Sequence, residues 1–277
     1  MEIDRTICVG SIPGVEGPYG YYPSLGAGIA FCVLFGISML LHAFTSARYR
    51  TWWQLIFAIG ALGEVIGWAG RTWSSECPYQ TTPFLIQICT LILAPAFFTA
   101  GIYVILGRLI VTFGRHVSPL SPNAYLYIFC TADIVSLVVQ AVGGGMASFA
   151  YQQTPPRDTE TGTHIMVAGI LFQLAAIIVF SFLFARVIVK ALKSRGEVLR
   201  QREIQYIIAA TTFSVVVIVT RSIYRTIELL QGWEGYLITT ERFFLALDGA
   251  MMVLAVAAFN IARPGWAEAG KSDRSSC

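Results

Sequence analysis

The chain has 277 residues, of which 56% are hydrophobic and 13% are charged, and its formal net charge is +3. Soluble domains average about 25% charged residues, so this chain carries too few charges to cover the surface of a soluble enzyme. Its Lys and Arg residues form no basic stripe that could follow a phosphate backbone, which excludes a nucleic-acid-binding protein. The composition therefore indicates an integral membrane protein.

Seven apolar segments are long enough to cross a bilayer, whose apolar core of about 30 Å requires about 20 residues of helix. Turn-forming or charged residues bound each segment, so we predict an all-α bundle of seven transmembrane helices. The predicted spans cover residues 24–45, 52–70, 84–106, 123–145, 165–189, 204–223 and 241–261. This membrane domain lies between an N-terminal segment, 1–23, and a C-terminal tail, 262–277. The N-terminal segment lacks the basic and apolar regions of a signal peptide, so we expect the first span to be retained.

The distribution of basic residues predicts the orientation of the bundle. One set of loops and ends carries 12 Lys and Arg residues, five of them between residues 190 and 202, and the opposite set carries 4. Because basic residues concentrate in cytoplasmic loops, we predict an extracellular N-terminus and a cytosolic C-terminus. Segment 190–202 is then expected to lie at the anionic inner leaflet.

Two cysteines, Cys8 and Cys77, fall on the predicted outer side, where oxidation is permitted. A disulfide requires a specific distance and orientation of the two side chains. Sequence spacing does not supply that geometry, so bridged and free thiols both stay open.

Polar residues within the spans form the candidate site. Ionisable groups at membrane depth are costly and mark function by default, although some only hold helices together. Most of them fall between the midplane and the predicted outer surface, so we expect them to line a hydrated cavity open to the outer leaflet. Such a cavity suits an amphiphile with a polar head group, and it suits a polar agonist almost as well. The candidates are Glu64, Arg71, Gln87, Asp133, Gln140, Arg221, Arg225, Glu228, Glu241 and Asp248.

Two further features concern the helix backbone. Pro95 cannot donate a backbone hydrogen bond, so it is expected to kink the third span and free a carbonyl that a neighbour or water must satisfy. Gly143, Gly144 and Gly145 permit either close helix packing or a bend at the outer end of the fourth span. Simple packing is the favoured explanation of both features over a gating hinge.

Several chemistries are excluded by the sequence. The three histidines include no pair at i, i+4, which argues against haem or di-iron ligation, and no phosphate-binding loop of the G-x-x-x-x-G-K-[ST] type is present. The three lysines, Lys190, Lys193 and Lys271, lie outside the spans. We therefore expect no cofactor, no metal and no enzymatic activity.

The ordered polar residues resemble those of the fungal lipid-translocating exporter family, the RTA-like proteins named for resistance to aminocholesterol. The resemblance extends from about Tyr22 to Pro264. Two positions depart from it, the Gly and Ala that follow Pro23-Ser24 and Arg263 before Pro264. The matching residues are Tyr22-Pro23-Ser24, Glu64, Gly67, Arg71, Gln87, Ala94-Pro95, Tyr103, Leu106-Gly107-Arg108, Asp133, Ser136, Gln140, Gly143-Gly144-Gly145, Arg221, Tyr224, Arg225, Glu228, Glu241 and Asp248.

This resemblance implies a multi-pass plasma-membrane protein that exports sphingoid long-chain bases or related cationic lipids and toxins. Its partners would be a lipid or another amphiphile and the membrane itself, with no nucleic acid, and protein partners are left open. We expect Glu64, Asp133 and Asp248 to provide the counter-charge for a cationic head group, and Arg221 and Arg225 to keep these acids ionised when the site is empty. The alternative is a receptor or sensor that binds an amphiphile without moving it.

Overall fold

The structure is a computed structural model that describes residues 8–10, 12, 17, 19–152, 159–194, 201–232 and 235–262. Most of the predicted N-terminal segment, residues 195–200 of the basic segment and all but the first residue of the predicted tail, with Arg263 and Pro264, lie outside the described residues.

Seven helices of the described chain are long and apolar enough to cross a membrane. This confirms the predicted all-α bundle of seven spans and makes the chain an integral, multi-pass membrane protein. The seventh crossing has three parts, because a π-helical turn separates a short helix from a longer one. The elements are α1 (Leu25–Tyr49), η1 (Trp52–Gln54), α2 (Leu55–Glu76), α3 (Thr81–Phe113), η2 (Arg115–Val117), α4 (Pro122–Gln152), α5 (Glu160–Ser194), α7 (Arg202–Leu230), α8 (Glu241–Phe244), the π-helical turn η3 (Leu245–Gly249) and α9 (Ala250–Ala262).

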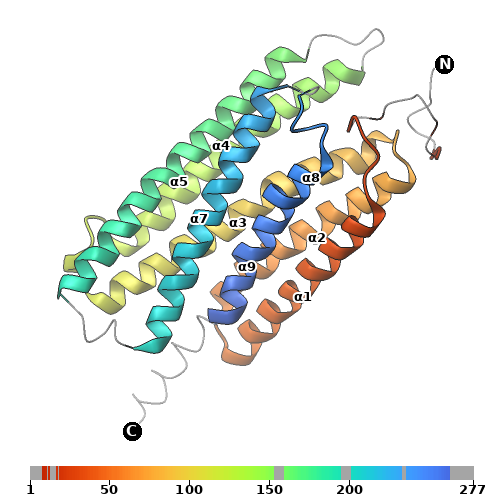
Figure 1. The fold of residues 1–277 in the computed structure, drawn as a ribbon. Coiled ribbons are helices and arrows are strands. Elements are labelled where there is room, and N and C mark those ends of the chain that lie inside the picture. The colour runs from red at the N-terminus through yellow and green to blue at the C-terminus, as the bar shows by residue number, and fades with distance from the viewer. Residues whose placement is uncertain are drawn as a thin grey trace.

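The spans pack as a closed ring in chain order. Each packs on the next, from α1 to α7, then α9 packs on both α7 and α1. Helix α3 also contacts α5 and α7 across the ring, so it is the most enclosed of the seven (Figure 1). Because the number of crossings is odd, α1 begins and α9 ends at opposite ends of the bundle (Figure 1).

A row of glycines on α2 allows α3 to approach closely. Gly60, Gly63, Gly67 and Gly70 recur at spacings of three and four residues, which places them on one face of the helix. A Cβ at Gly67 would lie 2.6 Å from the Thr90 hydroxyl, and the other three glycines likewise face α3. Close backbone contact at small residues is the usual way in which membrane helices pack.

The outward faces of the ring are apolar. Leu40, Ile134 and Phe182 are each more than 60% exposed, and similar side chains cover the rest of the circumference. In water so large an apolar surface would be unfavourable, whereas in a bilayer the same side chains contact lipid. Eight of the ten candidate polar side chains are instead buried in the interior, and the other two, Arg225 and Glu241, are half-buried.

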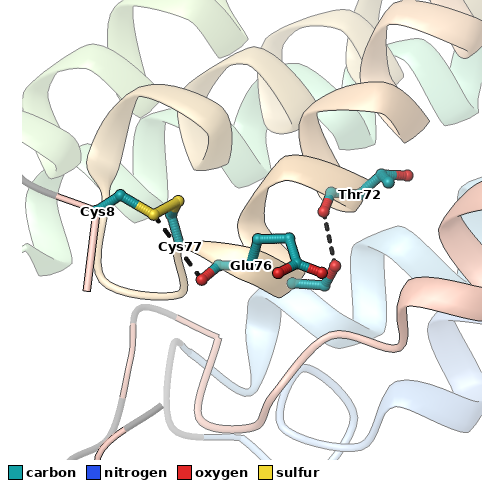
Figure 2. Close-up of a disulfide and its surroundings, with 5 residues drawn as sticks. Cys8, Thr72, Glu76 and Cys77 are labelled. Carbon is teal, nitrogen blue, oxygen red and sulfur yellow. Dashed lines mark hydrogen bonds between the residues drawn. A yellow bond between two sulfur atoms is a disulfide. The ribbon is translucent and has the colours of Figure 1, made fainter. Parts of the chain in front are cut away.

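The N-terminal segment is attached to the end of α2. Cys8 and Cys77 form a disulfide with their Cα atoms 4.9 Å apart, close to where α2 ends at Glu76 (Figure 2). The Cys8 sulfur also lies 3.9 Å from the Glu76 carbonyl oxygen (Figure 2). We call this the disulfide end of the bundle, and the end where α1 meets η1 the opposite end.

Candidate functional site

Five of the ten candidate side chains form one group inside the bundle, which we call the charge cluster: Glu64, Arg221, Arg225, Glu228 and Asp248. They come from α2, α7 and η3. With a rise of 1.5 Å per residue, Arg221 lies about 13 Å from the end of α7 at the disulfide end. The cluster therefore extends from the half of the bundle nearer that end to its middle, where Glu64 lies 12 residues before the end of α2.

Arg221 lies on the sixth span, α7, and its side chain contacts both the seventh span and the third. Its Nε lies 2.6 Å from Oδ1 of Asp248, and its Nη2 donates to the carbonyl oxygen of Leu91 at 2.9 Å. Leu91 lies four residues before Pro95, so its carbonyl is the one that loses its helical donor because proline has no N–H. The predicted freed carbonyl is thus satisfied by an arginine from another helix, which packs α7 against the proline site of α3.

Arg225 and Glu228 form the second ion pair of the cluster, one turn apart on α7. Tyr224 donates to the other oxygen of Glu228 at 2.8 Å, so both carboxylate oxygens are engaged. The spacings of three and four residues place these side chains on the same face of the helix. Glu228 is 1% exposed, so the pair is removed from solvent.

Asp248 lies in the π-helical turn. Such turns are rare and occur frequently at functional sites, because the extra residue changes the direction of the side chains around it. The neighbouring residue Gly249 is packed so tightly against Trp68 and Phe31 that a Cβ would overlap the Trp68 ring. The turn thus brings the backbone of the seventh span close to α2 at the depth of the charge cluster.

Glu64 is the member of the cluster that lacks an ion-pair partner. It is 1% exposed, and its Oε1 accepts no hydrogen bond within the described part of the chain. Asp248 and Arg221 are the charged groups with the strongest electrostatic effect on it. Since Asp248 and Glu228 already pair with the two arginines, the cluster holds one carboxyl group more than it has guanidinium groups.

A second group surrounds Arg71 at the disulfide end. Its guanidinium donates to Glu241 at 2.8 Å and to the Tyr21 hydroxyl at 2.9 Å, and it is fully buried. Glu241 also accepts a hydrogen bond from the backbone N–H of Ser24, whose own hydroxyl caps α1. This arrangement fastens the starts of α1 and α8 to α2. Four aromatic rings lie within 6 Å of the guanidinium carbon, those of Tyr19, Tyr21, Trp68 and Phe244.

Gln87 belongs to the same end of the bundle. The Tyr19 hydroxyl donates to its Oε1 at 2.9 Å and lies 2.9 Å from the Ser74 hydroxyl. Burial raises the pKa of Tyr19 to about 12, so this hydroxyl keeps its proton at neutral pH. Burial also raises the pKa of Tyr21. Both tyrosines are therefore neutral hydrogen-bonding groups that cover the Arg71 side chain.

Asp133 and Gln140 lie apart from the charge cluster, which corrects the expectation that all ten residues line one cavity. Thr99 and Tyr103 of α3 donate to Oδ2 of Asp133 at 2.8 and 3.1 Å, and no ion pair is formed by Asp133 within the described residues. Gln140 donates to Ser136 and to Gln173 on α5. The α4 residues face α3 and α5, because α4 is separated from α7 by α5 in the ring.

The three glycines of α4 are not equivalent. A Cβ at Gly143 would lie 2.5 Å from the backbone nitrogen of Met166 and 2.6 Å from the carbonyl oxygen of Gly162, so α4 and α5 approach closely there. No atom lies within 4 Å of the corresponding position at Gly145, and Gly144 is nearly as open. Helix α4 runs without interruption through all three residues, which supports packing at Gly143.

The acidic and basic side chains are packed together instead of lining an exposed cavity. Within the charge cluster Glu64, Glu228 and Asp248 are each at most 2% exposed, and Arg221 is 8% exposed. The structure therefore presents the cluster in a closed arrangement. Within the described residues, no three His, Cys, Asp or Glu side chains are placed to hold a metal ion.

Several residues that contact the charge cluster or Arg71 were not predicted from the sequence. Tyr19 and Tyr21 precede the first span, where aromatic residues are usual at the membrane interface, and the Tyr19-Gly20-Tyr21-Tyr22 run was the available signal. The glycine spacing on α2 was also visible. The Leu91 carbonyl could be inferred from Pro95, but its partner could not.

Comparison with known proteins gives a consistent assignment. The family model described as RTA1 like protein matches residues 57–271. The chain is 35% identical to the sphingoid long-chain base transporter RSB1 of Saccharomyces cerevisiae, over 91% of this chain and 75% of that protein. It is 33% identical to protoporphyrin uptake protein 1 of the same organism, over 74% of this chain and 66% of that protein. Protein RTA1, also of this yeast, is 29% identical over 89% of this chain and 84% of its own length.

No solved structure gives a significant match to the chain. The family match nevertheless includes all but the first two residues of α2, the elements from α3 to α9 and every residue of the charge cluster, and the relatives cover most of the chain. The chain belongs to the RTA1-like protein family.

Proposed function

We propose that this protein transports cationic amphiphiles, with sphingoid long-chain bases as the first substrate class to test. The observation that carries the proposal is Glu64, a buried carboxyl group that lies beside an arginine–carboxylate pair and has one oxygen that accepts no hydrogen bond from the described residues. An ammonium head group would give this oxygen a charge-assisted partner. The names of the relatives support the same class, since they describe a sphingoid base transporter and a porphyrin uptake protein.

Glu64 and Asp248 provide the counter-charge in this proposal, and Arg221 keeps Asp248 ionised when the head group is absent. Arg225 and Glu228 neutralise one another and position Tyr224. The hydrocarbon tail of the substrate stays in lipid, which the apolar outer face of the ring permits. Because the cluster is closed in the structure, entry of the head group requires the spans around Glu64 to separate. In this proposal Gln87, Arg71 and Glu241, whose hydrogen bonds join segments at the disulfide end, control that movement.

The direction is export across the plasma membrane, with the disulfide end outside. This orientation rests on the basic residues at the opposite end and on the disulfide, which persists in oxidising compartments. Treatment of intact cells with a membrane-impermeant reductant and then an impermeant maleimide should label Cys8 and Cys77. A cysteine introduced at Ser194, at the opposite end, serves as the matched control and should react only after permeabilisation. Labelling of the Ser194 cysteine in intact cells would reverse the assignment.

Tolerance of a toxic sphingoid base tests the function in cells. Glu64→Gln and Asp248→Asn should each abolish tolerance while the protein reaches the cell surface, because both variants keep the side-chain size but remove the negative charge. Asp133→Asn is the matched control, since Asp133 is held by neutral hydroxyl donors outside the cluster. Full tolerance in both cluster variants would refute the proposed role of these residues.

Transport by the purified protein separates a transporter from a sensor. Liposomes containing the protein and a fluorescent long-chain base should move the base between leaflets faster than protein-free liposomes. Binding of the base without such movement would refute transport and assign the chain as a sensor of the same ligand.

A further inference from the structure

The charge cluster has an odd number of ionisable side chains. Arg221 pairs with Asp248 and Arg225 pairs with Glu228, and Glu64 is left over. With all five side chains ionised, the cluster would hold one uncompensated negative charge away from solvent. A buried charge without a partner is strongly unfavourable, so the empty, closed arrangement requires either a proton on Glu64 or a bound cation.

The surroundings of Glu64 leave no other compensation within the described residues. The charged groups that act on it are Arg221 from α7 and Asp248 from η3, and these already form an ion pair. Helix α1 contributes the neutral thiol of Cys32, which lies 3.7 Å from the Val65 carbonyl. The facing part of α3 is apolar, since Gly63 packs against Ala94. On α2 itself the indole N–H of Trp68 is a hydrogen-bonding group that acts on Glu64, but it is neutral and adds no compensating charge.

We propose that Glu64 is the site at which a proton and a cationic head group exchange, so that transport is an electroneutral antiport of one proton for one cation. This inference rests on the proposed function and adds its energy source. In the empty protein Glu64 is a neutral carboxylic acid. When the ammonium group binds, the O–H bond of Glu64 breaks, the proton leaves to water, and the carboxylate pairs with the cation. Return of a proton from the other side releases the cation there.

Exchange at a single carboxyl group has two consequences. The cluster has zero net charge in both states, so neither half of the cycle moves net charge and the membrane potential should not drive it. A proton gradient should drive it, with the cation moving toward the more acidic side as protons leave that side. Buried carboxyl groups in membrane proteins are typical of proton pathways for the same reason.

Proton release on binding tests the exchange directly. The purified full chain in weakly buffered detergent is mixed with N,N,N-trimethylsphingosine, whose fixed charge cannot itself bind or lose a proton at nitrogen. A pH-sensitive dye should report about one proton released for each cation bound, as binding linkage requires. Binding without proton release in the unaltered protein would overturn the inference.

Matched variants assign the released proton to Glu64. Glu64→Gln should release none at concentrations of the cation that saturate it, and Asp133→Asn should release as much as the unaltered protein. Glu64→Asp keeps a carboxyl group and should keep the release, which provides a reading if the glutamine variant does not fold. Undiminished release by a folded Glu64→Gln variant would assign the proton to another group and overturn the inference.

Reconstituted protein distinguishes failure of the coupling from failure of transport. Exchange of labelled for unlabelled trimethylsphingosine is measured first at equal pH on both sides, as the fraction shielded from extraction by albumin. An acidic lumen should then drive net accumulation, and a potassium diffusion potential should not. Exchange that ignores the pH gradient, or net movement that follows the potential, would overturn the antiport and leave the proposed transport intact. Absence of any exchange would refute the proposed function itself.

Discussion

The charge cluster and the polar groups of α4 are both buried in the bundle, but their chemistry differs. On α4, Asp133 and Ser136 make their contacts with neutral groups, two hydroxyls of α3 and a backbone carbonyl of α5. In the charge cluster, two ion pairs leave Glu64 without an ion-pair partner among the described residues. A buried polar group that is hydrogen-bonded to neutral groups of neighbouring helices serves packing, whereas a buried carboxyl group with an oxygen that accepts no hydrogen bond within the described residues is kept at a cost to stability and therefore indicates a function.

This difference separates two explanations that the sequence leaves open for each residue. The residue either takes part in function or only holds helices together. The α4 contacts connect neighbours in the ring, from α3 through α4 to α5, and they fix the distance between helices. The cluster connects α2, α7 and the π-helical turn, and Arg221 also contacts α3. Substitutions in the cluster should therefore change transport as well as stability, whereas substitutions in α4 should change mainly stability. The predictions below test that division. They begin with the largest expected effect and the double-mutant test of the same contact, and then turn to the smaller effects expected in α4.

Arg221→Met should cause the largest loss of stability. It removes the partner of Asp248 and the donor to the Leu91 carbonyl at once, and breaking a buried ion pair by removing one partner costs about 3–5 kcal/mol. Unfolding of the purified protein in a detergent titration with sodium dodecyl sulfate, followed by circular dichroism, measures the change in free energy. A loss below about 1 kcal/mol would show that the ion pair does not hold the helices together.

Pro95→Ala sharpens the same test because it restores a backbone N–H opposite the Leu91 carbonyl. In the Arg221→Met background it should recover about 1 kcal/mol, the usual net value of one hydrogen bond. The double-mutant cycle isolates this coupling. Strictly additive effects of the two substitutions would contradict the contact between Arg221 and that carbonyl.

Gly143→Ala should lower the free energy of unfolding by about 1–3 kcal/mol, as expected for overpacking a tight contact. The added methyl would overlap the backbone of Met166 and Gly162, so α4 and α5 must move apart. Gly145→Ala is the matched control, because the space around it is open and alanine favours the helix. The same titration measures both, and equal effects would contradict the close approach at Gly143.

Tyr103→Phe should cost about 1 kcal/mol, because it removes one hydroxyl donor to Asp133 and leaves the other in place. Its rate of sphingoid base transport in liposomes should remain within about twofold of the unaltered protein, as for substitutions outside a site. A much larger loss of transport with little change in stability would return Asp133 to the functional site.

The fold class followed directly from the sequence because each span must satisfy its own backbone hydrogen bonds in lipid. The seven apolar segments therefore had to be helices. Pro95 also had a consequence that was stated in advance, a freed carbonyl, whereas the close packing at the glycines of α2 was not predicted although their spacing is visible in the sequence. Arrangement in a ring was not predictable in this way, since an amphipathic pattern gives the buried face of a helix and not its neighbour.

Membership of the candidate site was only partly predictable. The sequence identified all five residues of the charge cluster, because charges at membrane depth are rare enough to stand out. It also grouped Asp133 and Gln140 with them on depth alone, and the structure places both next to other helices. Depth along a span is fixed by counting residues, but the direction of a side chain around the bundle depends on how the helices pack.

The sequence by itself determined that the chain spans a membrane seven times and which few polar side chains lie at membrane depth. Composition and segment length decide those properties, because the bilayer acts on each segment separately. Only the tertiary structure decided the pairing, with Arg221 on Asp248 and on the Leu91 carbonyl, Arg225 on Glu228, and Glu64 without an ion-pair partner in the described part of the chain. The reason is physical: ion pairs between helices depend on distances of about 3 Å, which arise only when residues far apart in the chain are packed together.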